Sequence, residues 1–296
     1  MFPNCLPPLS PSLTESTSVA LAEAIEAKPV PTSLRETPVL TTFVRRGAGG
    51  DPILLIHGFD SSVLEFRRLL PLLATQNETW AVDLLGFGFT ERSPDLSISP
   101  ATILAHLRGF WECAIAKPMI LVGASMGGAT AIDFTLNYPE AVKSLVLLDS
   151  AGISRGPIAG KFLFPPLDYF ATEFLRHPKV RQSISENAYF DKTFASEDAR
   201  ICAAWHLDSP NWNRALASFT KSGGYGSFRD RLSEIRQPTL ILWGRNDRIL
   251  GTKDAEKFRD AIDDSKLIWI ENCGHVPHLE RPDITAENIL NFRKNP

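Results

Sequence analysis

Short apolar runs bounded by turn residues recur along most of the chain. Residues 53–56 follow a Gly-rich turn and are all apolar, and residues 119–122 form a second such run. Runs of this kind are typical of strands that a parallel sheet buries on both faces. With one alternating stretch near the N-terminus, the pattern predicts strands at residues 41–46, 53–56, 79–82, 119–122, 144–148, 239–243 and 266–270.

Stretches with helical spacing separate these predicted strands, at residues 64–73, 100–116, 126–137, 253–261 and 286–293. Strands that alternate with helices across short links pair in parallel through right-handed crossovers. We therefore predict an α/β fold with a mostly parallel central sheet flanked by helices.

The alternation stops between about residues 152 and 236, where aromatic residues, prolines and helix-compatible stretches replace the strand-like runs. This predicts a helical insertion, or lid, at residues 152–236, within a core formed by residues 36–151 and 237–296. Pro and Ser dominate the start of the chain. We expect residues 1–35 to form a loose N-terminal arm.

Composition narrows the class of protein. Hydrophobic content of 44% and charged content of 22% are those of an ordinary globular protein. A net charge of -3, with no Lys/Arg cluster longer than a pair, argues against nucleic-acid binding. The start lacks the basic and apolar regions of a secretory signal, and Glu15, Glu23 and Glu26 argue against a transit peptide. Since the four cysteines are scattered and no run of about 18 apolar residues occurs, we expect an intracellular protein, either soluble or resting on a membrane surface.

The motif Gly123-Ala124-Ser125-Met126-Gly127 directly follows the predicted strand at 119–122 and opens the predicted helix at 126–137. A sharp strand-to-helix turn needs small neighbours, because a side chain at Gly123 or Gly127 would collide with the adjacent backbone. The bend exposes the Ser125 hydroxyl and points the first helical N–H groups at negative charge that develops there. We predict that Ser125 is a nucleophile. The alternative is a glycine-rich turn that only packs the helix on the strand.

A serine hydroxyl needs a base to take its proton. His275 is the best candidate, because its loop follows the last predicted strand and would reach over the carboxyl edge of the sheet. His278 completes a His-x-x-His pattern that suggests a metal, but zinc needs further ligands, and the sequence nearby supplies no convincing set. We predict no metal and no cofactor, and expect His278 to pack or hydrogen-bond within the loop.

The segment from His57 to Asp60 follows the predicted strand at 53–56. In an acyl-transfer site of this kind, the loop here supplies one oxyanion-binding N–H and the residue after the nucleophile supplies the other. These would be the N–H groups of Phe59 and Met126. His57 itself is expected to hold the loop through side-chain hydrogen bonds.

A carboxylate near the end of a strand should support the histidine. Asp247 and Asp149 both fit the chain order of nucleophile, acid and histidine. Asp247 is favoured because its loop should lie beside the loop that carries His275, whereas Asp83 is expected to form a turn. Ser125, His275 and Asp247 would then cleave an ester-like bond in two steps through an acyl-enzyme.

Taken together, these motifs resemble the α/β-hydrolase superfamily across about residues 40–295. Residues 57–62, 80–89, 221–225 and 272–275 are similar to the chlorophyll dephytylases of photosynthetic organisms, although the plant members have Trp at Phe87 and Leu at Met126. This resemblance implies an α/β-hydrolase fold with a lid. It also implies an enzyme that releases phytol from chlorophyll, leaving chlorophyllide, at thylakoid membranes.

Large apolar residues gather at the start of the insertion: Phe162, Phe164, Leu167, Tyr169, Phe170, Phe174 and Leu175. A lid of this composition suits a long isoprenoid alcohol or peripheral contact with a membrane surface. The same side chains would serve equally well as the lid's own core. Three alternatives stay open: a general esterase or thioesterase, another Ser-His-Asp hydrolase acting on a small hydrophobic substrate, and a non-enzymatic ligand receptor.

Overall fold

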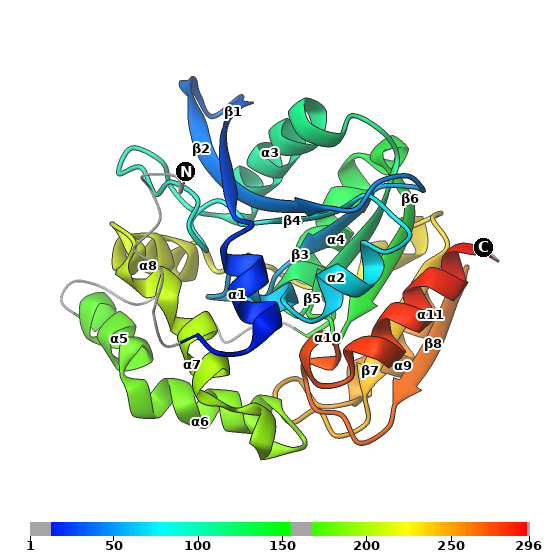
Figure 1. Cartoon of the computed structure of the whole chain (residues 1–296). Helices are drawn as coiled ribbons and strands as arrows, with labels where there is room; N and C mark the ends of the chain where they lie inside the picture. The colour runs from blue at the N-terminus through cyan, green and yellow to red at the C-terminus, as the bar shows by residue number, and fades with distance from the viewer. Residues whose placement is uncertain (1–12, 155–166, 295–296) are drawn as a thin grey trace.

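A computed structural model describes residues 13–154 and 167–294, which build a central eight-stranded sheet (Figure 1). The strand order is β1-β2-β4-β3-β5-β6-β7-β8. β1 and β2 are antiparallel to their neighbours, and the remaining pairs are parallel, so the predicted mostly parallel sheet is confirmed. The strands are β1 Glu26–Thr32, β2 Arg35–Arg46, β3 Ile53–Ile56, β4 Thr79–Val82, β5 Met119–Ala124, β6 Val142–Leu148, β7 Thr239–Gly244 and β8 Ser265–Ile270.

Helices cover both faces of the sheet. They are α1 Ser16–Ala22, α2 Leu69–Leu73, α3 Pro100–Phe110, α4 Met126–Asn137, α5 Leu167–Arg176, α6 Pro178–Ala188, α7 Glu197–Ala204, α8 Trp212–Ser222, α9 Lys253–Ala261, α10 Pro277–Glu280 and α11 Pro282–Lys294. Two further short helices matter below, η1 Val63–Phe66 and η6 Trp205–Asp208. One hydrophobic core contains side chains of α3, α4 and α9, and the other contains side chains of α1, α2 and α11.

Strand β3 shows why the buried strands are apolar at every position. Leu54 and Ile56 belong to one of the two cores, and Ile53 and Leu55 belong to the other. Successive strand residues point to opposite faces, so a sheet that is covered on both faces needs apolar side chains throughout. All four residues have zero exposure, as the sequence pattern predicts.

The expectation of a loose arm over residues 1–35 is wrong for its second half. α1 lies there, and β1 pairs with β2 along the edge of the sheet. The sequence did not predict this strand because Pro29 and Pro31 argue against one, since proline lacks a backbone donor that a central strand needs. An edge strand tolerates such residues because only one of its sides is paired.

Four helices, α5 to α8, lie within the predicted insertion, between β6 and β7 in the chain, and Figure 1 shows them together on one side of the molecule. The described residues 167–236 contain no strand, as expected. Phe162 and Phe164 lie outside the described residues, and the structure does not describe the side chains of residues 167–170. Their expected role in the lid stays a prediction.

Candidate active site

Ser125 occupies a strained bend between β5 and α4. Its backbone φ of 52° and ψ of −119° lie outside the regions that most residues adopt. A Cβ atom at Gly123 would collide with the carbonyl oxygen of Gly127, and one at Gly127 would collide with that of Ile56. Ser125 is partly exposed between the buried residues Ala124 and Met126. The prediction that this bend requires small neighbours is therefore confirmed.

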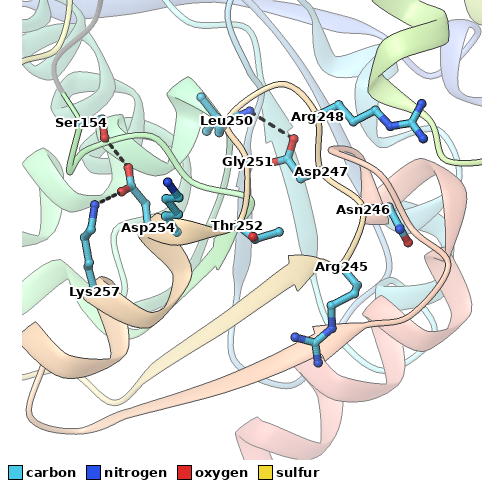
Figure 2. A pocket seen from close by; sticks show the side chains of 11 residues that line it. Ser154, Arg245, Asn246, Asp247, Arg248, Leu250, Gly251, Thr252, Asp254 and Lys257 are labelled. Atoms are coloured by element: carbon cyan, nitrogen blue, oxygen red, sulfur yellow. Dashed lines mark hydrogen bonds and ion pairs between the residues drawn. The ribbon is translucent and has the colours of Figure 1, made fainter.

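His275 and Asp247 form a buried pair. The distance from His275 Nδ1 to Asp247 Oδ2 is 3.0 Å, and the two residues are 7% and 6% exposed. The other carboxylate oxygen, Oδ1, accepts the N–H groups of Ile249 (2.7 Å) and Leu250 (3.1 Å), and Figure 2 shows the Leu250 bond within the loop after β7. Because a carboxylate only accepts, His275 Nδ1 carries the proton between them, which leaves Nε2 as a base.

Asp149, the competing acid, does not hydrogen-bond to His275. It is fully buried, and its Oδ1 accepts the Gly244 N–H at 2.9 Å. Burial, reinforced by the charge of the neighbouring Asp247, raises the pKa of Asp149 well above its usual value. Only Asp247 contacts the His275 ring, so the geometry favours Asp247 as the supporting acid.

Asp149, Asp247 and His275 also place one ligand atom each within 4.8 Å of one another, the one such set of three or more His, Cys, Asp or Glu among the described residues. The set coincides with the hydrogen-bonded pair itself. A metal would have to displace the proton that His275 Nδ1 shares with Asp247, so the absence of a metal stays our prediction.

Ser125 and His275 line one cavity of about 290 Å³. Phe59 also lines it from the loop after β3, and most of the other lining side chains are apolar. Met126 is the first residue of α4, so its N–H has no acceptor within the helix. The cavity thus brings together the nucleophile, the base and the Phe59 loop that the sequence predicts.

His57 has the structural role expected of it. Its ring is fully buried, and Nε2 lies 3.1 Å from the Leu84 N–H, which donates to it. The proton is therefore on Nδ1, 2.8 Å from the Gly58 carbonyl oxygen. Asp83 forms the expected turn: its carboxylate accepts the N–H groups of Val63 (2.7 Å) and Phe89 (2.9 Å).

His278 contacts a residue outside its own loop. Its Nε2 lies 3.1 Å from Glu65 Oε1 on η1, and Glu65 Oε2 accepts the Gly58 N–H at 2.9 Å. Burial would raise the pKa of Glu65, but the contact with His278 outweighs it and lowers the pKa to about 2. The sequence did not indicate a role for Glu65, which holds the Phe59 loop through its bond to the Gly58 N–H.

The insertion supplies the far wall of the cavity, with Leu175 from α5 and Arg181, Ile184 and Ala188 from α6. Of these, only Leu175 was a candidate from sequence. The carbonyl oxygen of Ala188 accepts the His275 N–H at 2.7 Å, so the insertion directly contacts the loop that carries His275. Cys113, Cys202 and Cys273 are free thiols, and Cys5 lies outside the described residues.

The model of the alpha/beta hydrolase family matches residues 53–288. The chain belongs to this family. It is 32% identical to the alpha/beta hydrolase domain-containing protein VTE7 of Arabidopsis thaliana, over 98% of this chain and 90% of that protein. It is 30% identical to the 2-hydroxy-6-oxo-6-(2'-aminophenyl)hexa-2,4-dienoic acid hydrolase of Metapseudomonas resinovorans, over 86% of this chain and 87% of that protein.

Among solved structures, a serine hydrolase involved in carbazole degradation superposes with a TM-score of 0.76. Its sequence is 26% identical, and the match covers 92% of this chain and all of that one. Fold and relatives together support the assignment of this alpha/beta hydrolase as a hydrolytic enzyme.

Proposed function

We propose that this alpha/beta hydrolase is a serine carboxylic-ester hydrolase, and that its substrate is a chlorophyll-type phytyl ester. The observation that carries the proposal is that His275, paired with Asp247 at 3.0 Å, lines the same cavity as Ser125. A reactive serine, a base and an apolar cavity are what hydrolysis of a hydrophobic ester requires.

The reaction begins when Ser125 Oγ attacks the ester carbonyl carbon and His275 Nε2 accepts the hydroxyl proton. Asp247 fixes the imidazole tautomer and stabilises the imidazolium that forms. The N–H groups of Phe59 and Met126 bind the oxyanion, and His275 returns the proton to the departing alcohol. Water that His275 deprotonates then attacks the acyl-enzyme, and His275 returns this proton to Ser125 Oγ as the acid is released.

The phytyl part of the proposal rests on the sequence resemblance and on the wall of the cavity. Leu175, Ile184 and Ile249 line the cavity together with Val276 and Leu279. Transfer of an isoprenoid chain from water onto such surfaces contributes about 25 cal/mol per Å² of apolar area removed from water. The long alcohol would supply this binding energy.

A second candidate has its own observation, the 30% identity with a dienoic acid hydrolase over 86% of the chain. In that reading, the same Ser125 and His275 would hydrolyse a carbon–carbon bond next to a ketone. The two candidates predict different products from different substrates, so one panel separates them.

The purified protein is incubated with detergent-dispersed chlorophyll, with pheophytin, with short acyl esters and with a 2-hydroxy-6-oxo-dienoic acid. We expect chlorophyllide and free phytol from chlorophyll, with none from the Ser125→Ala variant. Turnover of short esters alone would reduce the proposal to a general esterase. Turnover of the dienoic acid alone would favour the second candidate, and binding that stalls after one turnover would indicate a receptor.

A membrane substrate also requires access. No described helix is both long and apolar enough to cross a bilayer. Large apolar side chains are nevertheless exposed where the cavity meets solvent: Phe59 (44%), Ile184 (47%) and Ile249 (42%). We propose that this rim rests on the thylakoid surface. Replacing Ile184 and Ile249 by Ser should release the protein from vesicles of thylakoid lipids in a flotation assay, and unchanged flotation would refute the contact.

A further inference from the structure

One buried carboxylate joins the insertion to the loop after β3. Asp60, directly after Phe59, is 7% exposed, and three donors converge on it. Arg181 Nη1 lies 2.5 Å from Oδ2, while His206 Nε2 and Trp212 Nε1 lie 3.2 Å and 2.8 Å from Oδ1. All three donors belong to the insertion, whereas Asp60 belongs to the core.

The donors come from separate segments, namely α6, η6 and α8. Arg181 Nη2 also donates to the carbonyl oxygens of Asp60 (3.3 Å) and Ala203 (2.6 Å), so this guanidinium binds the loop and the end of α7 at once. A single carboxylate therefore gathers three parts of the insertion at one point of the core, and Arg181 ties a fourth, α7, to the same point.

The charges at this point are balanced. Burial would raise the pKa of Asp60, but the hydrogen bond from His206 and the charge of Arg181 outweigh it and lower the pKa to about 2. Burial also lowers the pKa of His206, so near neutral pH this ring donates as a neutral imidazole. Arg181 supplies the compensating positive charge. Removal of one partner of such a buried pair leaves the other charge uncompensated.

Asp60 also fixes the backbone of the loop. Its φ of 48° lies in the left-handed region, which Asp and Asn adopt more readily than most residues. On the other side of Phe59, the Gly58 N–H donates to Glu65 at 2.9 Å. The Phe59 peptide is thus held by the core on one side and, through Asp60, by the insertion on the other.

We propose that Asp60 is a positioning residue that couples docking of the insertion to formation of the oxyanion hole. While α6, η6 and α8 bind the carboxylate, the Phe59 N–H keeps the direction that an oxyanion needs. When the insertion moves away, the loop loses this restraint. The inference rests on the proposed function, because the oxyanion role of Phe59 is part of it.

The first test uses Asp60→Asn and Arg181→Met with a short acyl ester as the substrate. Asparagine tolerates the same backbone conformation, so Asp60→Asn removes mainly the charge. We expect kcat to fall about tenfold in either variant with KM little changed. This is less than the ~10²–10³ cost of deleting a donor outright, because the N–H is displaced but not removed. The double variant should be no worse than the single ones, because both break the same contact.

Arg200→Met is the matched control, since Arg200 forms an exposed ion pair with Glu197 within α7 and does not touch the loop. Its kcat should equal that of the unmodified protein. If Asp60→Asn and Arg181→Met keep full kcat, or fall only through KM, the proposal is overturned.

Hydrogen exchange measured on the same variants needs no substrate. We expect the amides of residues 58–62 to exchange faster in both Asp60→Asn and Arg181→Met, and to be unchanged in Arg200→Met. Unchanged exchange in the first two variants would contradict the coupling. This readout stands even if the unmodified protein cleaves no ester, so a failure of the proposed function is distinguished from a failure of this inference.

Discussion

The two walls of the cavity are built differently. On the core side, every residue of β5 and β7 is buried, and the loops that follow these strands carry Ser125 and Asp247. On the insertion side, α6 has no buried residue at all, and Phe174 of α5 is 64% exposed. The proposed reacting groups thus lie directly after fully buried strands. Helix α6, which would contact the substrate, has no buried residue of its own and is free to vary.

A substitution on the core side of the cavity should have the largest effect on kcat. Replacing Ser125 by Ala removes the nucleophile, so we expect kcat to fall by a factor on the order of 10⁶, as for other serine triads. The thermal midpoint should stay close to that of the unmodified protein, because alanine fits a bend that already accommodates a side chain. Steady-state kinetics and calorimetry check both statements, and appreciable residual turnover would refute the assignment.

The next largest effect should follow from Asp247→Asn. An amide at this position favours the wrong tautomer of His275, so we expect kcat to fall about 10⁴-fold. Asp149→Asn is the matched control: burial raises the pKa of Asp149, which favours its uncharged form, and asparagine keeps an acceptor for the Gly244 N–H. A larger loss of kcat from Asp149→Asn than from Asp247→Asn would reverse the choice of acid.

Asp60 joins the two walls of the cavity, and its titration should make the stability of the folded protein depend on pH. Its pKa falls from an ordinary 3.8 to about 2 on folding, so the folded state favours the ionised form. This stabilisation is complete above about pH 4 and is lost as the pH falls towards 2. At about 1.4 kcal/mol per pKa unit, it amounts to about 2 kcal/mol.

The measurement is the free energy of unfolding in denaturant at pH 5 and pH 2, for the unmodified protein and for Asp60→Asn. Arg181 and Arg92 exert positive charge on Asp60, His206 donates a hydrogen bond to it, and both proteins retain these three groups. The stability gap between the two should narrow by about 2 kcal/mol at the lower pH. If the difference in free energy of unfolding between the two proteins does not change with pH, contacts with the insertion do not stabilise the ionised carboxylate of Asp60.

The smallest effect should come from the insertion wall. Leu175→Ala removes apolar surface from the cavity, so KM for a phytyl ester should rise about tenfold, while a short acyl ester is turned over as before. Ile284→Ala is the control, because Ile284 is equally apolar but 45% exposed and does not line the cavity. If Leu175→Ala impairs the turnover of both esters equally, Leu175 acts in the reaction itself and not in the selection of the substrate.

The core side was largely predictable from sequence, because each of its signals is local. The bend at Ser125 needs small neighbours within a few residues, and the loops of His275 and Asp247 directly follow apolar strands. β1 was missed because Pro29 and Pro31 argue against a strand unless its edge position is known. The choice between Asp247 and Asp149 also needed coordinates, since β6 and β7 lie side by side and both aspartates follow them.

Contacts between the core and the insertion could not be predicted. Asp60 and Trp212 are 152 positions apart, and no local pattern indicates that the carboxylate finds this partner. Glu65 lies among apolar residues of η1, and its role is explained only by its contact with His278 of α10, which follows the last strand. The roles of such residues follow from contacts with partners that are distant in the sequence, and adjacent residues do not indicate them.

The most direct test of the central claim is to map the site at which a fluorophosphonate probe, which traps activated serines, binds covalently. We expect one adduct per chain, on Ser125, with no adduct in Ser125→Ala and much slower labelling in Asp247→Asn. An adduct on any other serine, or labelling of Ser125 that is indifferent to Asp247, would contradict it.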